Sequence, residues 1–287
     1  MSYQEDVPSA ETTGSPEVLG DSETIASSDT AGEPGQPSGA GVSEATSDAL
    51  AQLTEADLTP AARRKLLARA VVVGRGAGRA LRGPKAAVSW ATELLVEVIP
   101  HLAVRDLETL QRHYPGKSGE QLADALVRNA SRVAASLGAA GGGVAAIEWA
   151  APPALLAAPA LITIETTAVV AVEIKLLAEL HEVYGAPIRG SAPERVSALL
   201  TAWTRRRGVS LLQGGRGFST VLGAGLRKEL RDRLLRRMGR NLTTLGPLLT
   251  GAAVGAELNR RSTRSLGDEV RKDLRKRLPS GPRVIDG

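Results

Sequence analysis

The segment from Ala139 to Gly185 constrains the fold more than any other part of the chain. It reads AAGGGVAAIEWAAPPALLAAPALITIETTAVVAVEIKLLAELHEVYG, and only seven of its 47 residues are charged or histidine. A helix that is apolar on most of its sides is found in a protein core or at a membrane. The segment contains no recognisable catalytic motif, so it predicts an architecture and not a reaction.

Two charge-free runs are too short to cross a bilayer as simple helices. Trp149–Ile164 and Asn241–Ala256 each contain 16 residues, and both are interrupted by proline. A spanning helix needs about 20 predominantly apolar residues. We expect these runs to lie in the core or at an interface. The alternative that residues 139–184 or 241–256 enter a bilayer stays open at this point.

An acidic segment precedes the rest of the chain. Residues 1–58 contain 12 Asp and Glu and no Lys or Arg, with Ser, Thr, Gly and Pro making up most of the remainder. Such a composition cannot bury enough apolar surface to offset the entropy lost on ordering. We therefore predict a disordered acidic tail over 1–58, an ordered domain over 59–279 and a flexible C-terminus over 280–287.

The composition after residue 58 favours helices. Alanine, leucine and arginine dominate, and the whole chain has seven aromatic residues, a bias typical of helix over sheet. The sequence predicts an all-α fold with a single multi-helix domain and a core rich in glycine and alanine. The expected helices are 60–82, 86–99, 102–113, 118–136, 160–183, 192–206, 226–240, 247–260 and 265–277. Thr59 before Pro60 is a typical helix start, and Gly185 followed by Pro187 is a typical stop.

Glycines recur at a spacing of four residues in two of these helices. Gly251, Gly255 and Asn259 share one helix face, and Gly138 and Gly142 repeat the same step. Glycine inside a helix costs roughly 0.5–1 kcal/mol relative to alanine. Close approach of two helix backbones would offset this cost, in a soluble core or in lipid alike.

Three acidic residues lie in apolar surroundings: Glu148, Glu165 and Glu173. A buried carboxylate is costly unless it is paired, so each is expected to meet an arginine or reach solvent, with a proton or ion site as the alternative. The chain has no cysteine, which excludes disulfides and thiolate metal sites, and its three histidines are isolated. We predict no catalytic residue, no metal and no cofactor. A hydrolase or transporter-like use of Glu165 or Glu173 is the weakest hypothesis.

The charge of the chain is unevenly distributed. Without the 12 acidic residues of the tail, 19 acidic and 36 basic residues remain, a net charge of +17. This predicts a polyanionic partner. The first hypothesis is an anionic membrane surface or a membrane protein, and the second is nucleic acid, against which the lack of aromatic platforms and binding motifs counts. The proposed contact residues are Arg205, Arg206, Arg207, Arg233, Arg236, Arg237 and Arg240.

Two stretches resemble the EcsC family of bacterial proteins. The first joins Gly141–Gly143 to a long helix ending in Ala178–Pro187, and the second runs over Leu245–Asn259 and continues to Thr263 and Leu266-Gly267. The residues that carry the likeness are Gly141, Gly142, Gly143, Tyr184, Gly185, Gly246, Gly251, Gly255, Asn259 and Gly267. The chain departs from the family pattern at Ala186-Pro187, where the family usually has an acidic residue.

The resemblance covers residues 116–277 and implies a helical accessory protein linked to membranes, in transporter or envelope processes, without established catalytic residues. The N-terminus lacks the basic and apolar regions of a signal peptide. We therefore expect a non-enzymatic cytoplasmic protein, peripheral to the inner face of the cell membrane. A basic helical protein associated with nucleic acid is the alternative.

Overall fold

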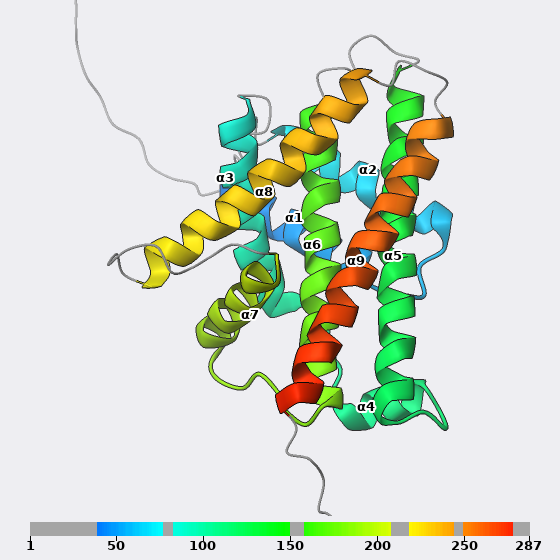
Figure 1. Cartoon of the computed structure of the whole chain (residues 1–287). Helices are drawn as coiled ribbons and strands as arrows, with labels where there is room; N and C mark the ends of the chain where they lie inside the picture. Colours follow the sequence, from blue (N-terminus) through cyan, green and yellow to red (C-terminus); the bar gives the residue numbers. More distant parts are fainter. Residues whose placement is uncertain (1–38, 77–82, 150–157, 208–217, 244–248, 278–287) are drawn as a thin grey trace, which may run out of the picture. The chain divides into compact units, whose positions relative to one another are not determined.

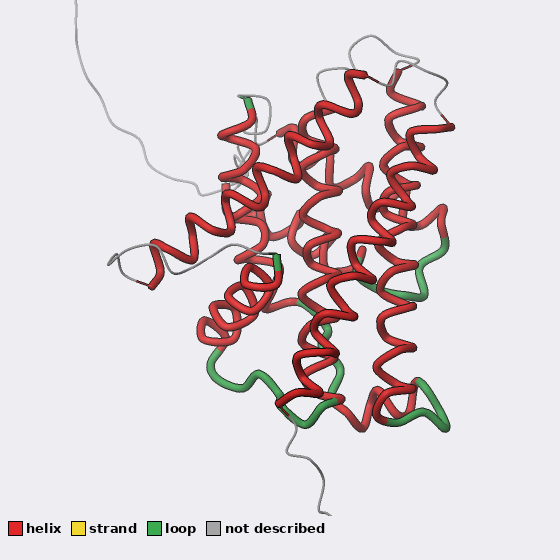
Figure 2. Tube along the Cα trace, viewed as in Figure 1, coloured by secondary structure: helices red, strands yellow, loops and turns green. Residues whose placement is uncertain are grey.

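The computed structural model describes residues 39–76, 83–149, 158–207, 218–243 and 249–277. Within these ranges every regular element is a helix, as Figure 2 shows, which confirms the predicted all-α fold. The helices are α1 (Gly39–Leu53), α2 (Pro60–Gly76), α3 (Pro84–Val98), a short 3₁₀ turn (Ile99–His101), α4 (Leu107–His113), α5 (Gly119–Trp149), α6 (Ala158–Val183), α7 (Ala192–Arg206), α8 (Phe218–Thr243) and α9 (Leu249–Arg277).

Helix α6 is the central element. From Ala160 to Leu180 every residue is buried except the half-buried Glu165. Helices α1, α2, α3, α5, α7, α8 and α9 all pack against it (Figure 1). A helix that is surrounded in this way needs no polar face, which explains why its few charges stand among valines and leucines. The predicted bounds of 160–183 agree closely with the observed helix.

Helices α5 and α9 form the most extensive helix pair and run antiparallel (Figure 1). A Cβ atom added to Gly138 would lie 2.7 Å from the carbonyl of Gly255. A Cβ atom added to Gly267 would lie 2.6 Å from the side chain of Val127. The two backbones therefore approach more closely than alanine would allow, as the glycine spacing predicted for α9.

The ends of α5 and α6 are joined through Tyr184. Its hydroxyl donates a hydrogen bond of 2.6 Å to Glu120 at the start of α5, and Glu120 also pairs with Arg271 of α9 at 2.9 Å. Gly185 follows with a φ of +67°, and the amide of Ala186 bonds back to His181. The predicted stop after Tyr184 is confirmed, because glycine adopts this left-handed conformation without strain.

The prediction of disorder through residue 58 is wrong for residues 39–58. These include α1, whose Leu50 and Leu53 are fully buried against the rest of the fold. The buried guanidinium of Arg63 donates to the carbonyl of Leu53 at 2.6 Å and to that of Glu55 at 2.8 Å, which satisfies the C-terminal end of α1. The average composition of residues 1–58 is strongly polar, so it did not reveal the short apolar stripe of α1. The predicted tail over 1–38 and the C-terminus over 280–287 lie outside the described residues.

Three predicted helix bounds need correction. The helix expected at 118–136 continues to Trp149, and those expected at 247–260 and 265–277 are one helix, α9. The glycines that follow residue 137 lie inside α5, where close packing compensates for them, and residues 261–264, expected between two helices, continue α9. The helix expected at 102–113 starts at Leu107, because Asp106 caps it by accepting a hydrogen bond of 2.8 Å from the amide of Thr109.

None of the helices in the described part of the chain combines the length and apolar character that crossing a membrane requires. For residues 158–183 the structure supports packing among helices as the reason for the apolar sequence, whereas Val254 of the second apolar run is 52% exposed.

We predict that Gly138→Ala destabilises the protein by about 1–3 kcal/mol, because the new methyl group would overlap the backbone of α9. Gly255→Ala should be tolerated, since its Cβ atom would meet the carbonyl oxygen of Gly138 at an ordinary 3.5 Å. Gly223→Ala on α8 is the matched control, with a single side-chain atom at 3.9 Å. Urea unfolding measures all three. Equal losses for Gly138→Ala and Gly255→Ala would contradict the close contact.

Candidate functional site

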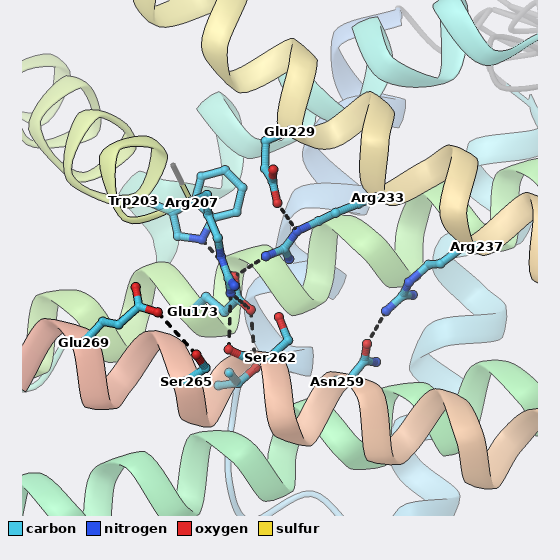
Figure 3. Close-up of polar contacts among 11 residues, drawn as sticks. Glu173, Trp203, Arg207, Glu229, Arg233, Arg237, Asn259, Ser262, Ser265 and Glu269 are labelled. Atoms are coloured by element: carbon cyan, nitrogen blue, oxygen red, sulfur yellow. Dashed lines mark hydrogen bonds and ion pairs between the residues drawn. The ribbon is translucent and has the colours of Figure 1, made fainter. Parts of the chain in front are cut away.

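The centre of the charged network is Glu173 on α6, whose side chain is 0% exposed. Its Oε1 accepts from the guanidinium of Arg207, directly after α7, and from the hydroxyl of Thr263 on α9 at 3.4 Å. Its Oε2 accepts from the indole of Trp203 at 2.8 Å and from Arg233 of α8 at 3.1 Å. Figure 3 shows how these side chains converge on one carboxylate.

Arg233 is itself fixed by two further contacts with its surroundings. Its Nε lies 2.9 Å from Glu229, one turn earlier on α8. Its guanidinium carbon lies 5.1 Å from the centre of a Trp203 ring, a cation–π contact. Arg207 also reaches the carbonyl of Ser262 at 3.5 Å. The cluster of Glu173, Arg207 and Arg233 therefore holds α7, α8 and α9 to α6.

The electrostatics of the cluster favour a permanent charge. Burial by itself raises the pKa of Glu173, but the guanidinium groups of Arg233 and Arg207 outweigh this effect and lower it to about 2. The pKa of Arg233 is likewise raised, because the two nearby carboxylates outweigh its burial. At neutral pH Glu173 and Arg233 are therefore both ionised.

A second polar group lies two turns away on α6. Glu165 is 2.6 Å from Arg237 of α8, and Arg237 also donates to the side-chain oxygen of Asn259 on α9 (Figure 3). The amide nitrogen of Asn259 donates to the carbonyl of Ala134 on α5 at 3.2 Å. A Cβ atom on Gly141 would overlap the carboxylate of Glu165. Gly141 thus makes room for the acid, and Asn259 connects three helices.

The remaining charges of α6 follow the same rule. Glu179 receives two hydrogen bonds from Arg105, at 2.8 and 3.0 Å. Lys175 pairs with Glu55 at 2.9 Å, in the loop between α1 and α2. Glu165, Glu173, Lys175 and Glu179 thus fasten neighbouring segments to the central helix.

This arrangement is suited to holding helices together and not to acid–base chemistry. An ionised carboxylate offers about four acceptor positions, and Glu173 has four donors. A group with a pKa of about 2 does not take up a proton near neutral pH, as general acid–base catalysis would require. The interpretation of Glu165 and Glu173 as carboxylates paired with arginine is confirmed. The side chain of Glu148 lies outside the described residues.

The predicted polyanion surface needs a correction. Arg207, Arg233 and Arg237 point inward to the acids of α6, and Arg206 pairs with Asp273 of α9. Burial of the α6 carboxylates requires nearby cations, and these four arginines are consequently unavailable as a continuous outer patch. The predicted residues that stay exposed are Arg205 and Arg236. The side chain of Arg240 lies outside the described residues.

A helical wheel could have revealed the inward arginines. Arg233 and Arg237 follow Leu226 by seven and eleven residues, so they share its face of α8. Leu226 and Leu230 are buried on that face. Arginine on the apolar side of an amphipathic helix indicates a buried acid on the partner, but the sequence does not identify which acid. The sequence did not identify Trp203 or Thr263 as partners of Glu173, since these hydrogen bonds depend on how the helices pack.

A different basic surface lies on the outer face of α8. Its members are Arg227, Lys228, Arg231, Leu235 and Arg236, all exposed, and we call them the outer α8 face. Arg231 pairs with Asp232 at 3.2 Å, whereas the other three cations have no acidic partner within the described part of the chain. Leu235 is 46% exposed among these charges.

The glycines and the other residues behind the EcsC resemblance have structural roles where they are described. Gly141, Tyr184, Gly185, Gly255, Asn259 and Gly267 all lie at helix contacts or helix ends, as given above. Gly142, Gly143 and Gly251 lie within α5 and α9. Gly246 lies outside the described residues.

We predict that Glu173→Gln destabilises the fold by about 3–5 kcal/mol, because it leaves two arginines without their counter-charge. The matched control is Glu257→Gln. Glu257 also contacts two arginines, Arg260 at 2.8 Å and Arg261 at 2.5 Å, but on the surface. Its loss should not change the urea midpoint measurably. Similar losses in the two variants would show that the buried cluster contributes no more than a surface pair.

The cluster also predicts a pH dependence with a definite sign. Folding lowers the pKa of Glu173 from 4.5 to about 2, so the stabilisation is complete above pH 4.5 and is lost as the pH falls toward 2. Urea unfolding of wild type and Glu173→Gln, at neutral pH and at about pH 3, should show a smaller difference in acid. Because both proteins contain the same other carboxylates, the contributions of those groups to the pH dependence cancel in this difference. A constant difference would contradict the lowered pKa.

Comparisons of the chain with protein-family models, with curated proteins and with solved structures find no match. The resemblance to the EcsC family therefore stays a prediction. The interpretation of the site depends on its own geometry.

Proposed function

We propose that this chain is a non-enzymatic accessory protein that binds an anionic membrane surface from the cytoplasmic side. The observation that supports this most directly is the outer α8 face. Arg227, Lys228 and Arg236 carry charge that no described acid neutralises, and Leu235 is exposed between them. Basic residues that flank an exposed apolar side chain are typical of helices that lie on anionic lipid.

The inner face of α8 supports the same proposal. Arg233 and Arg237 anchor this helix to two acids of the central helix. The anchoring fixes which side of α8 faces outward, so the backbone positions of the three unneutralised cations are fixed. The helix itself then needs no ordering on binding, which favours attraction at a surface.

The buried network supports an accessory role in preference to catalysis. The most deeply buried acid, Glu173, is permanently ionised and fully bonded to the protein's own donors. We therefore assign these charges to scaffolding. The outer α8 face, together with the membrane protein partner or lipid that it meets, carries the function.

The proposal predicts salt-sensitive binding to anionic vesicles. Each Lys or Arg near such a surface contributes about 1 kcal/mol, so Arg227→Gln, Lys228→Gln and Arg236→Gln together should weaken binding about 100-fold. The control removes three exposed basic residues from α4, the following loop and α5: Arg112→Gln, Lys117→Gln and Arg132→Gln. Cosedimentation with phosphatidylserine-containing and neutral phosphatidylcholine vesicles measures the effect.

Three results would contradict the proposal: equal binding to both kinds of vesicle, equal weakening by both sets of substitutions, or release of the protein from vesicles by DNA at equal charge concentration. The last would favour nucleic acid.

Leu235→Gln provides a separate check, because apolar contact is not screened by salt. This substitution should lower the binding that remains at high salt.

A further inference from the structure

A groove lies between the C-terminal parts of α6 and α9 and the length of α7, away from the outer α8 face. Its volume is about 660 Å³. The residues that line it are His181, Glu194, Ser197, Ala198, Thr201, Ala202, Arg205, Arg206, Asp273 and Arg277. Arg205 and Arg206 were expected in a polyanion surface, but the structure places them on the wall of a groove.

Positive charge in this groove exceeds negative charge. Arg206 and Arg277 both donate to the same oxygen of Asp273, the second at 2.9 Å. Two guanidinium groups thus share one carboxylate. Arg205 is exposed and has no acidic partner among the described residues. Three arginines therefore face a single acid that neutralises them, and the surplus favours a bound anion.

The other acid of the groove, Glu194, has a separate task. Its carboxylate accepts a hydrogen bond of 2.8 Å from the amide of Ser191 and completes the capping box of α7. The capping bond lies at the N-terminal end of α7, whereas Arg205 and Arg206 lie at the C-terminal end. Glu194 is consequently not positioned as their partner.

His181 adds a hydrogen-bond acceptor. Its Nδ1 lies 2.7 Å from the carbonyl of Leu177. A carbonyl only accepts, so Nδ1 carries the proton and Nε2 has a free lone pair in the neutral ring. Burial lowers the pKa of His181, and the charges of Arg206 and Arg277 lower it further, against the opposing effects of Leu177 and Asp273. The ring is thus neutral at pH 7.

The floor of the groove is small and largely apolar. Ala198 and Ala202 contribute methyl groups, and the hydroxyl of Thr201 is engaged with the carbonyl of Ser197 at 2.7 Å. The hydroxyl of Ser197 is a further donor beside this floor. The space exceeds that of a single phosphate, so it has room for part of an organic group.

We infer that this groove binds the phosphate group of a phosphomonoester, with the arginines on the phosphate oxygens and the organic part over the alanines. Guanidinium groups match phosphate in pairs of parallel hydrogen bonds. At pH 7 a phosphomonoester is mostly doubly ionised, so Nε2 of His181 takes up a proton from solvent when the phosphate binds and then donates to it. This site goes beyond the proposed membrane contact, because it uses none of the residues of the outer α8 face.

The chain supplies its own reporter for the test, since it has only three histidines. We would follow their imidazole signals by NMR in the full chain, with and without inorganic pyrophosphate at constant ionic strength. A bound anion favours the imidazolium form, so the pKa of His181 should rise on saturation while those of His101 and His113 stay unchanged. Equal movement of all three pKa values, or no movement of the His181 pKa with pyrophosphate and with the second probe below, would overturn the proposal.

Two variants and a second probe complete the test. Arg205→Gln should weaken pyrophosphate binding about tenfold, since a charged hydrogen bond is lost; Arg236→Gln on α8 should not. Arg205 has no acidic partner among the described residues that the substitution would leave unpaired, so the fold is retained. Short-chain phosphatidic acid below its micelle concentration is the second probe. A His181 response to pyrophosphate indicates a soluble phosphate, and a response to phosphatidic acid alone indicates a lipid phosphate. A loss of affinity that is equal in both variants would overturn the assignment.

Discussion

The structure depends on one constraint, the charge of Glu173 at the centre of an apolar helix bundle. A carboxylate that is removed from water needs counter-charges and hydrogen bonds to offset its desolvation. Arg207, Arg233, Trp203 and Thr263 supply them from α7, α8 and α9. Because these partners come from three helices, satisfying one charge also determines where those helices dock on α6. The acidic residues that interrupt the apolar sequence of α6 are therefore the points at which neighbouring helices attach to it.

Small residues let the helices approach closely enough for this network to form. The close contact of Gly138 and Gly255 brings α9 against α5, and Gly141 leaves space for the carboxylate of Glu165. Asn259 can then bond to α5 and to Arg237 of α8 at once. A larger side chain at Gly138 would push the helices apart, and one at Gly141 would displace the carboxylate of Glu165. Glycine packing and charge pairing are thus coupled parts of one core.

The same network divides the arginines into two groups with different roles. Arg207, Arg233 and Arg237 neutralise the core, and their positions orient the remaining basic side chains outward. Fewer arginines are free at the surface than the net charge implies, and two groups of the exposed basic side chains lie on separate surfaces. One is the outer α8 face with its exposed leucine, and the other is the groove beside His181. We assign an extended anionic surface to the first and a phosphate group to the second.

The sequence alone determined the helical class and the bounds of α6 and α7, because these follow from local propensity, capping and periodicity. It also indicated that Glu165 and Glu173 need partners. Only the tertiary structure decided which arginines supply them, that the apolar helix is central, that α1 is folded and that α9 is continuous through residues 261–264. Those outcomes depend on contacts between residues far apart in the chain, such as Glu173 with Thr263. Local sequence carries no record of such pairings, since the energy that selects them arises only when the helices pack.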